Sequence, residues 1–262
     1  MTKRSTVAVT LVVALVLLSG CSAVLDGGNG NGTATDDEGS GDAPEFEYPE
    51  GYGADGVSDG QAAVESHNSG LIESGSYSGM YSYDIDAGND SRVVNVTNRV
   101  DFDAEEGYQQ VDVETRRSAG SVDIYRTSDT RYRRSEFQNR TSVRSSERPF
   151  VAENFTALDP VRPLLTNVSG YDASVEEMNG ETVVVYETSG DVSVDQFYGI
   201  NDSSTISSFS GRFAVDSSGI VRSASYEMTY QVGDEERSLG VKYAISNVGR
   251  TSVERPGWVD DA

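Results

Sequence analysis

Apolar residues recur at every second position through most of the chain between residues 76 and 245, which is the period of a half-buried β-strand. Gly, Asp or Asn ends each such run, so the pattern predicts about ten or eleven antiparallel strands rather than parallel βαβ units. The clearest hairpin turn is Asn179-Gly180, between the runs 171–178 and 181–188. A helical turn is expected at 195–200. The chain is therefore built mainly from one antiparallel sheet.

Two stretches depart from this period and predict helices. An opening helix starts near Asp59 and ends at Gly75, with apolar side chains at helical spacing between them. A second apolar stretch, 149–168, is interrupted by prolines and predicts one or two short helices that cross the sheet after about six strands. Pro160 suits the first turn of such a helix, with Asp159 as its N-cap. The predicted fold class is α+β, with one N-terminal helix and a short helical insertion.

The N-terminus has the three zones of a secretory signal. Two cations precede the apolar run Val7 to Leu18, and small residues follow it. The run is shorter than the roughly 20 residues that a membrane-spanning helix needs. Leu18-Ser19-Gly20-Cys21 resembles the lipobox of prokaryotic lipoproteins, which implies cleavage before Cys21 and lipid on its thiol. Cys21 is the only cysteine, so no internal disulfide competes for it. We expect a protein held by lipid at the outer face of the cell membrane.

These features divide the chain into three parts. Residues 1–20 are the expected lipoprotein signal peptide. Residues 21–55 form an acidic linker rich in Gly and Asp, without apolar periodicity, which is typical of a flexible tether. Residues 56–262 are long enough for one folded domain.

The balance of acidic and basic residues excludes some functions and indicates the environment of the protein. Forty-three acidic residues face twenty basic ones, giving a formal charge of −23, and Lys occurs only at Lys3 and Lys242. Nucleic-acid binding is not expected, because it needs a cationic surface. Acid enrichment with so little Lys is typical of halophilic proteins. Seven Asn-x-Ser/Thr sequons are candidate glycosylation sites in an exported protein: Asn31, Asn89, Asn95, Asn139, Asn154, Asn167 and Asn201.

The order of helix, strands, helices and further hairpins resembles the LolA and LppX type of lipoprotein carrier. That resemblance implies a curved half-barrel with the helices packed on its concave face. The chain is also similar to an uncharacterised haloarchaeal cell-surface lipoprotein family. The similarity lies in the lipobox, the spacer, His67 before Gly75-Ser76-Tyr77, and the ending Thr251-Ser252-Val253-Glu254-Arg255-Pro256-Gly257-Trp258. Neither resemblance implies a reaction.

Carriers of the LolA type hold acyl chains between sheet and helices, so the resemblance implies an apolar cavity there. Ordinary core packing is the alternative for the same alternating residues. Seven residues are candidates for the cavity wall: Tyr81, Tyr83, Val96, Phe102, Phe213, Tyr226 and Met228.

The sequence contains few residues in a pattern that would indicate catalysis. His67, the only histidine, falls on the apolar stripe of the opening helix, where a packed or hydrogen-bonded role is expected. No Gly-x-Ser-x-Gly elbow accompanies it. Acids at 84–90 lack the Gly and Glu positions of an EF-hand loop. We expect no enzymatic activity, no cofactor and no metal.

Nine of the eighteen arginines lie between Arg116 and Arg148. They could form a cationic patch for a glycan, a lipid headgroup or an acidic protein. We expect instead that they pair across strands with nearby acids, namely Asp112, Asp123, Asp129 and Glu136.

Two hypotheses for the function remain. The first is a membrane-anchored binding module that holds or presents an apolar, lipid-like ligand. The second is a cell-envelope structural or interaction protein with a filled core, whose partners would be envelope proteins or glycans. A cavity between sheet and helices would favour the first, and a filled core with a contiguous Arg face the second.

Overall fold

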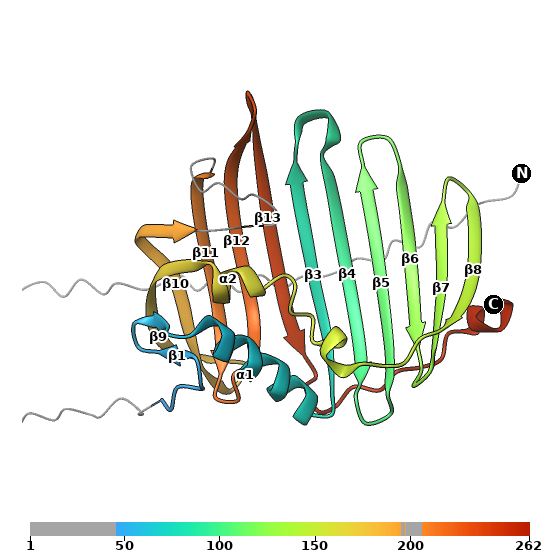
Figure 1. Ribbon diagram of the computed structural model, residues 1–262, viewed down its shortest axis with the longest axis horizontal. Helices are drawn as coiled ribbons and strands as arrows, with labels where there is room; N and C mark the ends of the chain where they lie inside the picture. The colour runs from blue at the N-terminus through green and yellow to red at the C-terminus, as the bar shows by residue number, and fades with distance from the viewer. Residues whose placement is uncertain (1–45, 195–196, 198–205) are drawn as a thin grey trace, which may run out of the picture. The chain divides into compact units, whose positions relative to one another are not determined.

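The structure, a computed structural model, describes residues 46–194, 197 and 206–262. Its main feature is one antiparallel sheet of eleven strands (Figure 1). The strands are β3 (Ser76–Asp86), β4 (Arg92–Asp101), β5 (Glu106–Thr115), β6 (Ala119–Arg126), β7 (Thr130–Phe137), β8 (Arg140–Glu147), β9 (Val168–Met178), β10 (Glu181–Val194), β11 (Ile206–Asp216), β12 (Val221–Val232) and β13 (Glu235–Ser246).

Two meanders build the sheet and meet in its middle. Strands β3 to β8 follow one another to one edge, and β9 to β13 return from the opposite edge, so that β13 pairs with β3. Tyr243 faces Tyr81 in this central pair. The connection 148–167 joins the two edges and contains the short helices η2 (Ala152–Phe155) and α2 (Arg162–Thr166). The predicted antiparallel sheet with a helical insertion after about six strands is confirmed.

Helix α1 (Gly60–Glu73) begins and ends where the sequence predicts. The Asp59 carboxylate accepts hydrogen bonds from the backbone N–H groups of Gln61 at 2.9 Å and Ala62 at 3.1 Å, which satisfies two donors that the helix leaves free. Gly75 has a φ of 77°, the left-handed conformation that commonly follows a helix end. Both helix-end predictions are confirmed.

The start of α2 was predicted wrongly. The helix begins at Arg162 with Val161 as its N-cap residue, and Asp159 and Pro160 lie in the turn before it. Burial explains the shift, because starting there places Leu164 and Leu165 against the core, where they are at most 2% exposed. The helical turn expected at 195–200 lies outside the described residues except for residue 197.

The folded domain begins before the predicted boundary at residue 56. Tyr52, in the part assigned to the linker, is 6% exposed and stacks on Tyr186 with ring centroids 5.9 Å apart. A small unpredicted hairpin follows, formed by β1 (Tyr52–Gly53) and β2 (Gly56–Val57). The Tyr186 hydroxyl donates a hydrogen bond to the Gly53 carbonyl at 3.0 Å. Residues 46–55 therefore include part of the domain core.

The two α-helices cover only half of the sheet (Figure 1). They lie over one face of the half that contains β9 to β13, and their apolar residues join those of these strands in one core. We call this the helix-side face. Over β5 to β8 neither of the two α-helices covers it, and the short helix η2 lies over the ends of β5 and β6 (Figure 1). No helix among the described residues is long and apolar enough to span a membrane.

Candidate ligand-binding site

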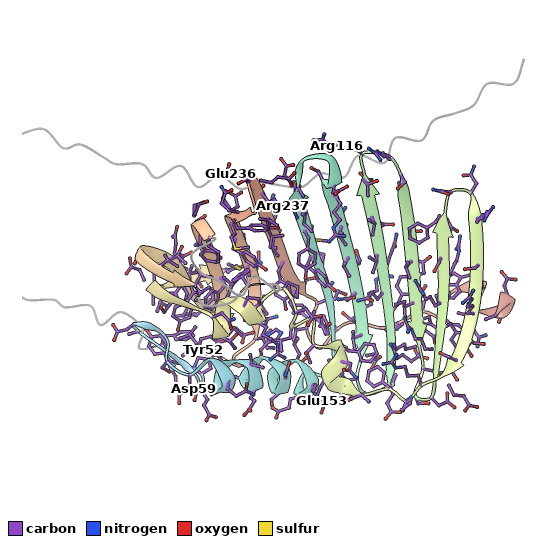
Figure 2. All side chains as sticks on the ribbon, turned by 45° about the horizontal axis from the view of Figure 1, so that its top comes forward. Tyr52, Asp59, Arg116, Glu153, Glu236 and Arg237 are labelled. Atoms are coloured by element: carbon purple, nitrogen blue, oxygen red, sulfur yellow. The ribbon has the colours of Figure 1, made fainter. Side chains whose placement is uncertain are left out.

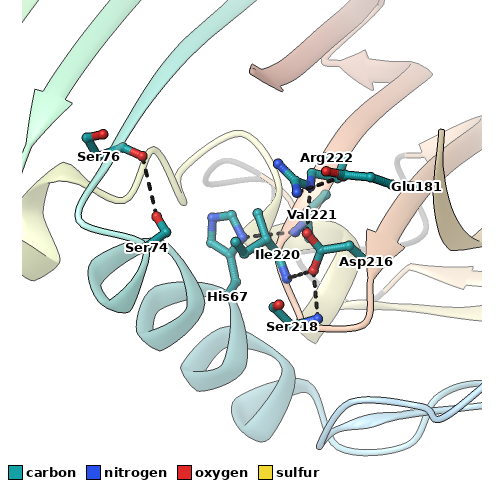
Figure 3. A network of polar contacts seen from close by, with 9 residues as sticks. All are labelled: His67, Ser74, Ser76, Glu181, Asp216, Ser218, Ile220, Val221 and Arg222. Atoms are coloured by element: carbon teal, nitrogen blue, oxygen red, sulfur yellow. Dashed lines mark hydrogen bonds and ion pairs between the residues drawn. The ribbon is translucent and has the colours of Figure 1, made fainter. Parts of the chain in front are cut away.

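His67 is a core residue. Its side chain is fully buried, its Nδ1 accepts a hydrogen bond from the Val221 N–H at 3.1 Å, and its Nε2 lies 3.0 Å from the Thr156 carbonyl (Figure 3). Because Nδ1 accepts, the ring is neutral with its hydrogen on Nε2, which donates to Thr156. Burial lowers the pKa of His67 to about 4. The packed, hydrogen-bonded role expected for His67 is confirmed, and the structure shows that it links α1 to β12 and to the connection 148–167.

A second polar network closes the turn between β11 and β12. The buried Asp216 carboxylate accepts from the backbone N–H groups of Ser218 and Ile220 and pairs with Arg222 at 2.5 Å (Figure 3). Arg222 also pairs with Glu181 at 2.8 Å. Every member of this network has a structural partner, so the network serves the turn rather than a ligand.

The seven candidate cavity residues belong mostly to the packed core, as the alternative of ordinary core packing predicts. Tyr81 and Tyr83 are half-buried. The other five are at most 9% exposed: Val96, Phe102, Phe213, Tyr226 and Met228. Phe213 lies 5.2 Å from the ring of Tyr171 and 5.0 Å from that of Tyr186. Side chains therefore fill the space between the helices and β9 to β13.

A cavity of about 300 Å³ lies instead at the border between the covered and the bare half of the sheet. Its floor is formed by the helix-side face of β3 to β6, and its wall by residues 153–159 and Arg162. Glu153, at the start of this wall, lies at the helix-bearing end of the sheet, and Arg116 lies at the opposite end (Figure 2). Of the seven predicted cavity residues, Tyr81 alone borders it.

The cavity combines apolar walls with polar and cationic groups. Its apolar contributors include Val100, Ile124, Phe155 and Leu158. Gln109, on the floor, donates to the Asn98 side chain at 3.0 Å. Burial is the main cause that raises the pKa of Tyr81, so this side chain keeps its proton at neutral pH.

One cation in the cavity is held by an aromatic ring. The Arg126 guanidinium lies over the ring of Phe155, 5.2 Å from its centroid, and Phe155 stacks on Phe150 at 4.4 Å. The Tyr77 hydroxyl donates to the Phe155 carbonyl at 2.5 Å and fixes the same segment. These contacts hold the connection over the sheet and leave Arg126 at the cavity wall.

Beside the cavity, four apolar residues remain half-exposed on the helix-side face of β5 and β6. Val111 faces Val122 across the two strands, and Val113 and Ile124 lie on the same face. In the covered half, such alternating residues are buried under the helices. Here the same pattern leaves an accessible apolar surface next to the cavity.

The prediction that the arginine cluster pairs with nearby acids is largely wrong. Among the ion pairs of the described residues, the cluster contributes only Arg134 with Glu136. Strand parity is the reason. Five arginines project from the helix-side face, whereas the acids of the same strands project from the opposite face. The five are Arg126, Arg131, Arg133, Arg140 and Arg144.

Sequence reasoning missed the cavity for two reasons. Its wall comes from the connection 148–167, whose position depends on contacts far apart in the sequence. Its floor contains Asn98 and Gln109, polar residues at positions that the alternation reserves for apolar ones. That interruption of the apolar pattern on two facing strands was the one signal in the sequence.

The expected modification sites fall in three groups. Cys21, Asn31 and Asn201 lie outside the described residues. Asn89 lies in the 3₁₀ turn Gly88–Asp90, and Asn167 is half-buried at the end of α2. The remaining three sequons are exposed, as a glycan acceptor must be: Asn95, Asn139 and Asn154. Lipidation and glycosylation remain predictions.

The fold and site define a class of protein: an open, curved antiparallel sheet, half covered by two helices, with an arginine-flanked cavity where the cover ends. The model of a family described as "Family of unknown function (DUF7537)" matches residues 6–262, and the chain belongs to that family. No curated protein matches the chain.

Solved structures with a similar arrangement are distant in sequence. LprF from Mycobacterium bovis is 9% identical, with a TM-score of 0.37 over 76% of this chain and 96% of LprF. The lipoprotein LppX from Mycobacterium tuberculosis is 11% identical, with a TM-score of 0.30 over 74% of this chain and 98% of LppX. A DUF1329 family protein from Desulfovibrio piger is 10% identical, with a TM-score of 0.28 over 76% and 95% of the two chains.

Proposed function

We propose that the protein is an extracytoplasmic lipoprotein, anchored through lipid on Cys21, whose folded domain binds a lipid-like molecule. The single observation that carries the binding proposal is the cavity of about 300 Å³, which opens beside the apolar surface of Val111, Val122 and Ile124. This volume is at the lower end of ordinary ligand pockets. A molecule with an apolar chain and a polar end fits a cavity with both kinds of wall.

The anchor rests on the lipobox at the end of an apolar run too short to span a membrane. Two lipid chains hold a protein stably at a membrane, whereas one chain gives marginal binding. The long acidic linker would then place the domain away from the bilayer surface.

Replacing Cys21 with serine is expected to abolish lipidation, because the serine hydroxyl does not replace the thiol in thioether formation. Mass spectrometry of protein extracted from its native membrane should show lipid on Cys21 of the unaltered chain. The Cys21→Ser variant should be released, or should keep its leader. A variant that is still cleaved before residue 21 and remains in the membrane would refute the anchor.

Filling the cavity is expected to weaken ligand binding. Ile124→Trp places a larger side chain in the floor of the cavity. The affinity for dioctanoyl-phosphatidylglycerol should fall by about tenfold or more, because the free energy of one lost apolar contact corresponds to about that change in Kd. Titration calorimetry with the lipid below its micelle concentration measures the change. Met80→Trp is the matched control, because Met80 is 60% exposed on the opposite face of β3.

Equal affinities of Ile124→Trp and the unaltered chain would place binding elsewhere. The second candidate function, an envelope interaction protein, is favoured by the filled core between the helices and β9 to β13. It predicts no binding of any monomeric lipid by the unaltered chain. The same titration therefore decides between the two.

A further inference from the structure

Two pairs of arginines face each other directly across the bare strands. Arg126 of β6 is opposite Arg131 of β7, and Arg133 of β7 is opposite Arg144 of β8. Side chains at such positions share one face, with Cβ atoms about 5 Å apart. Arg131 and Arg133 are also neighbours on this face, two positions apart on the same strand. We call these four residues the arginine quartet.

No acid shares this face of β5 to β8. The six acids of these strands all occupy the opposite face, by the same register that sets the quartet: Glu106, Asp112, Glu114, Asp123, Glu136 and Glu147. The chain carries a net charge of −23, so counter-charges are plentiful. The register nevertheless places none of the acids of these strands beside the quartet, and Glu153 and Asp159 of the connection 148–167 are the acids that line the cavity together with Arg126.

This arrangement costs stability in the isolated domain. Like charges directly opposite in a sheet destabilise it. Burial, and then the charges of Arg131 and Arg148, lower the pKa of Arg126; burial, and then Arg133 and Arg148, lower that of Arg131. The Nε of Arg131 is buried and has no hydrogen-bond partner among the described residues. A bound anion would relieve the repulsion among these guanidinium groups.

The quartet is continuous with the cavity. Arg126 belongs to both, since it lines the cavity and faces Arg131. Ile124, in the cavity floor, faces Arg133 directly. The helix-side face therefore changes from apolar at β5 and β6 to cationic at β7 and β8. A ligand that followed this gradient would have its chain on the valines and its charged end on the arginines.

We propose that the arginine quartet binds the oxyanion headgroup, phosphate or sulfate, of an anionic amphiphile whose chain occupies the cavity and the adjoining apolar surface. This inference rests on the proposed function and names the class of its ligand. Guanidinium groups bind such oxyanions through paired, charge-assisted hydrogen bonds. The apolar surface beside them favours an amphiphile over a free ion.

The test compares three probes on the full chain by titration calorimetry: dioctanoyl-phosphatidylglycerol, the neutral dioctanoylglycerol, and inorganic phosphate. The charged lipid should bind at least about tenfold more tightly than the neutral one, because the free energy of one hydrogen bond to a charged group corresponds to about that ratio of Kd values. Phosphate alone should bind more weakly than the charged lipid. Phosphate that binds as tightly as the charged lipid would overturn the amphiphile assignment in favour of a free-anion site.

Arg133→Gln should weaken binding of the charged lipid by about tenfold and leave the neutral lipid unaffected. Arg134→Gln is the matched control, with the same change of charge on the same strand but on the opposite face. Arg133→Gln also removes a like-charge contact with Arg144, so its melting temperature should not fall. An unaltered melting curve excludes misfolding as the cause of lost binding.

The outcomes separate this inference from the proposed function. If both lipids bind equally and Arg133→Gln changes neither, while Ile124→Trp weakens both, the headgroup assignment is wrong and the apolar site stands. If neither lipid binds the unaltered chain, both proposals are wrong. Equal losses in Arg133→Gln and Arg134→Gln would show a non-specific charge effect and would also overturn the headgroup assignment.

Discussion

Replacing Phe213 with alanine is expected to lower the free energy of unfolding by about 4 kcal/mol, within the range for buried phenylalanines. The ring is 1% exposed and packs against the rings of Tyr171 and Tyr186. Truncation removes the apolar burial and leaves a cavity that the surrounding strands fill only in part, since β10, β11 and β12 constrain one another through the sheet.

Urea unfolding of the variant and the unaltered chain measures the change. Phe137→Ala is the matched control, because it is the same substitution at a residue that is 45% exposed, and it should cost well under half as much. If Phe213→Ala cost no more than Phe137→Ala, the interior would be loosely packed. That result would favour the internal cavity that the resemblance to lipoprotein carriers implies over the core packing that is its alternative.

The same variant also separates the core from the ligand site. Phe213 does not border the cavity at β3 to β6, so its truncation should leave lipid affinity unchanged while the protein remains folded. Ile124→Trp should show the reverse, with weaker binding. Core and site would thus respond to different residues of one sheet.

The local parts of the fold were predictable because their causes are local. The Asn179-Gly180 hairpin requires two residues with positive φ, and these have φ of 55° and 82°. Alternation located the strands, since each must bury one face. The Asp59 cap and Gly75 marked the ends of α1 for equally local reasons.

The ligand site was not predictable because it depends on which half of the sheet is covered. Val111 and Val122 alternate with polar residues as fully as Tyr226 and Met228 do. Only the pairing of β3 with β13, between residues far apart in the chain, places the helices over one set and not the other. Periodicity reports that a face is apolar, and it carries no information on what covers it.

The arginine quartet was predictable only in part. Which residues of a strand share a face was available from the sequence, since Arg131 and Arg133 are two residues apart and Glu136 is an odd number of residues from both. The register between strands was not available from the sequence. A shift of one strand by one residue would have moved its arginines to the face that carries the acids of the neighbouring strand. The expectation of ion pairing failed at that step.

Acidification is expected to destabilise the protein through His67. Its pKa is about 4 in the folded state, against 6.5 for the exposed imidazole of the unfolded chain. Between these values the unfolded chain binds more protons than the folded one, so stability falls as pH drops from about 6.5 to about 4. The full difference is about 3 kcal/mol. Burial is the main cause, and a protonated Nδ1 would also direct a hydrogen at the N–H of Val221.

His67→Gln isolates this contribution. A glutamine amide can accept from the Val221 N–H and donate to the Thr156 carbonyl, but it does not titrate. Carboxylates contribute equally to both proteins, so the difference between their urea-unfolding curves reports His67 alone. The variant should lose less stability than the unaltered chain on acidification from pH 7 to pH 5. Parallel losses would show that His67 is protonated in the folded state, which its two hydrogen bonds and complete burial oppose.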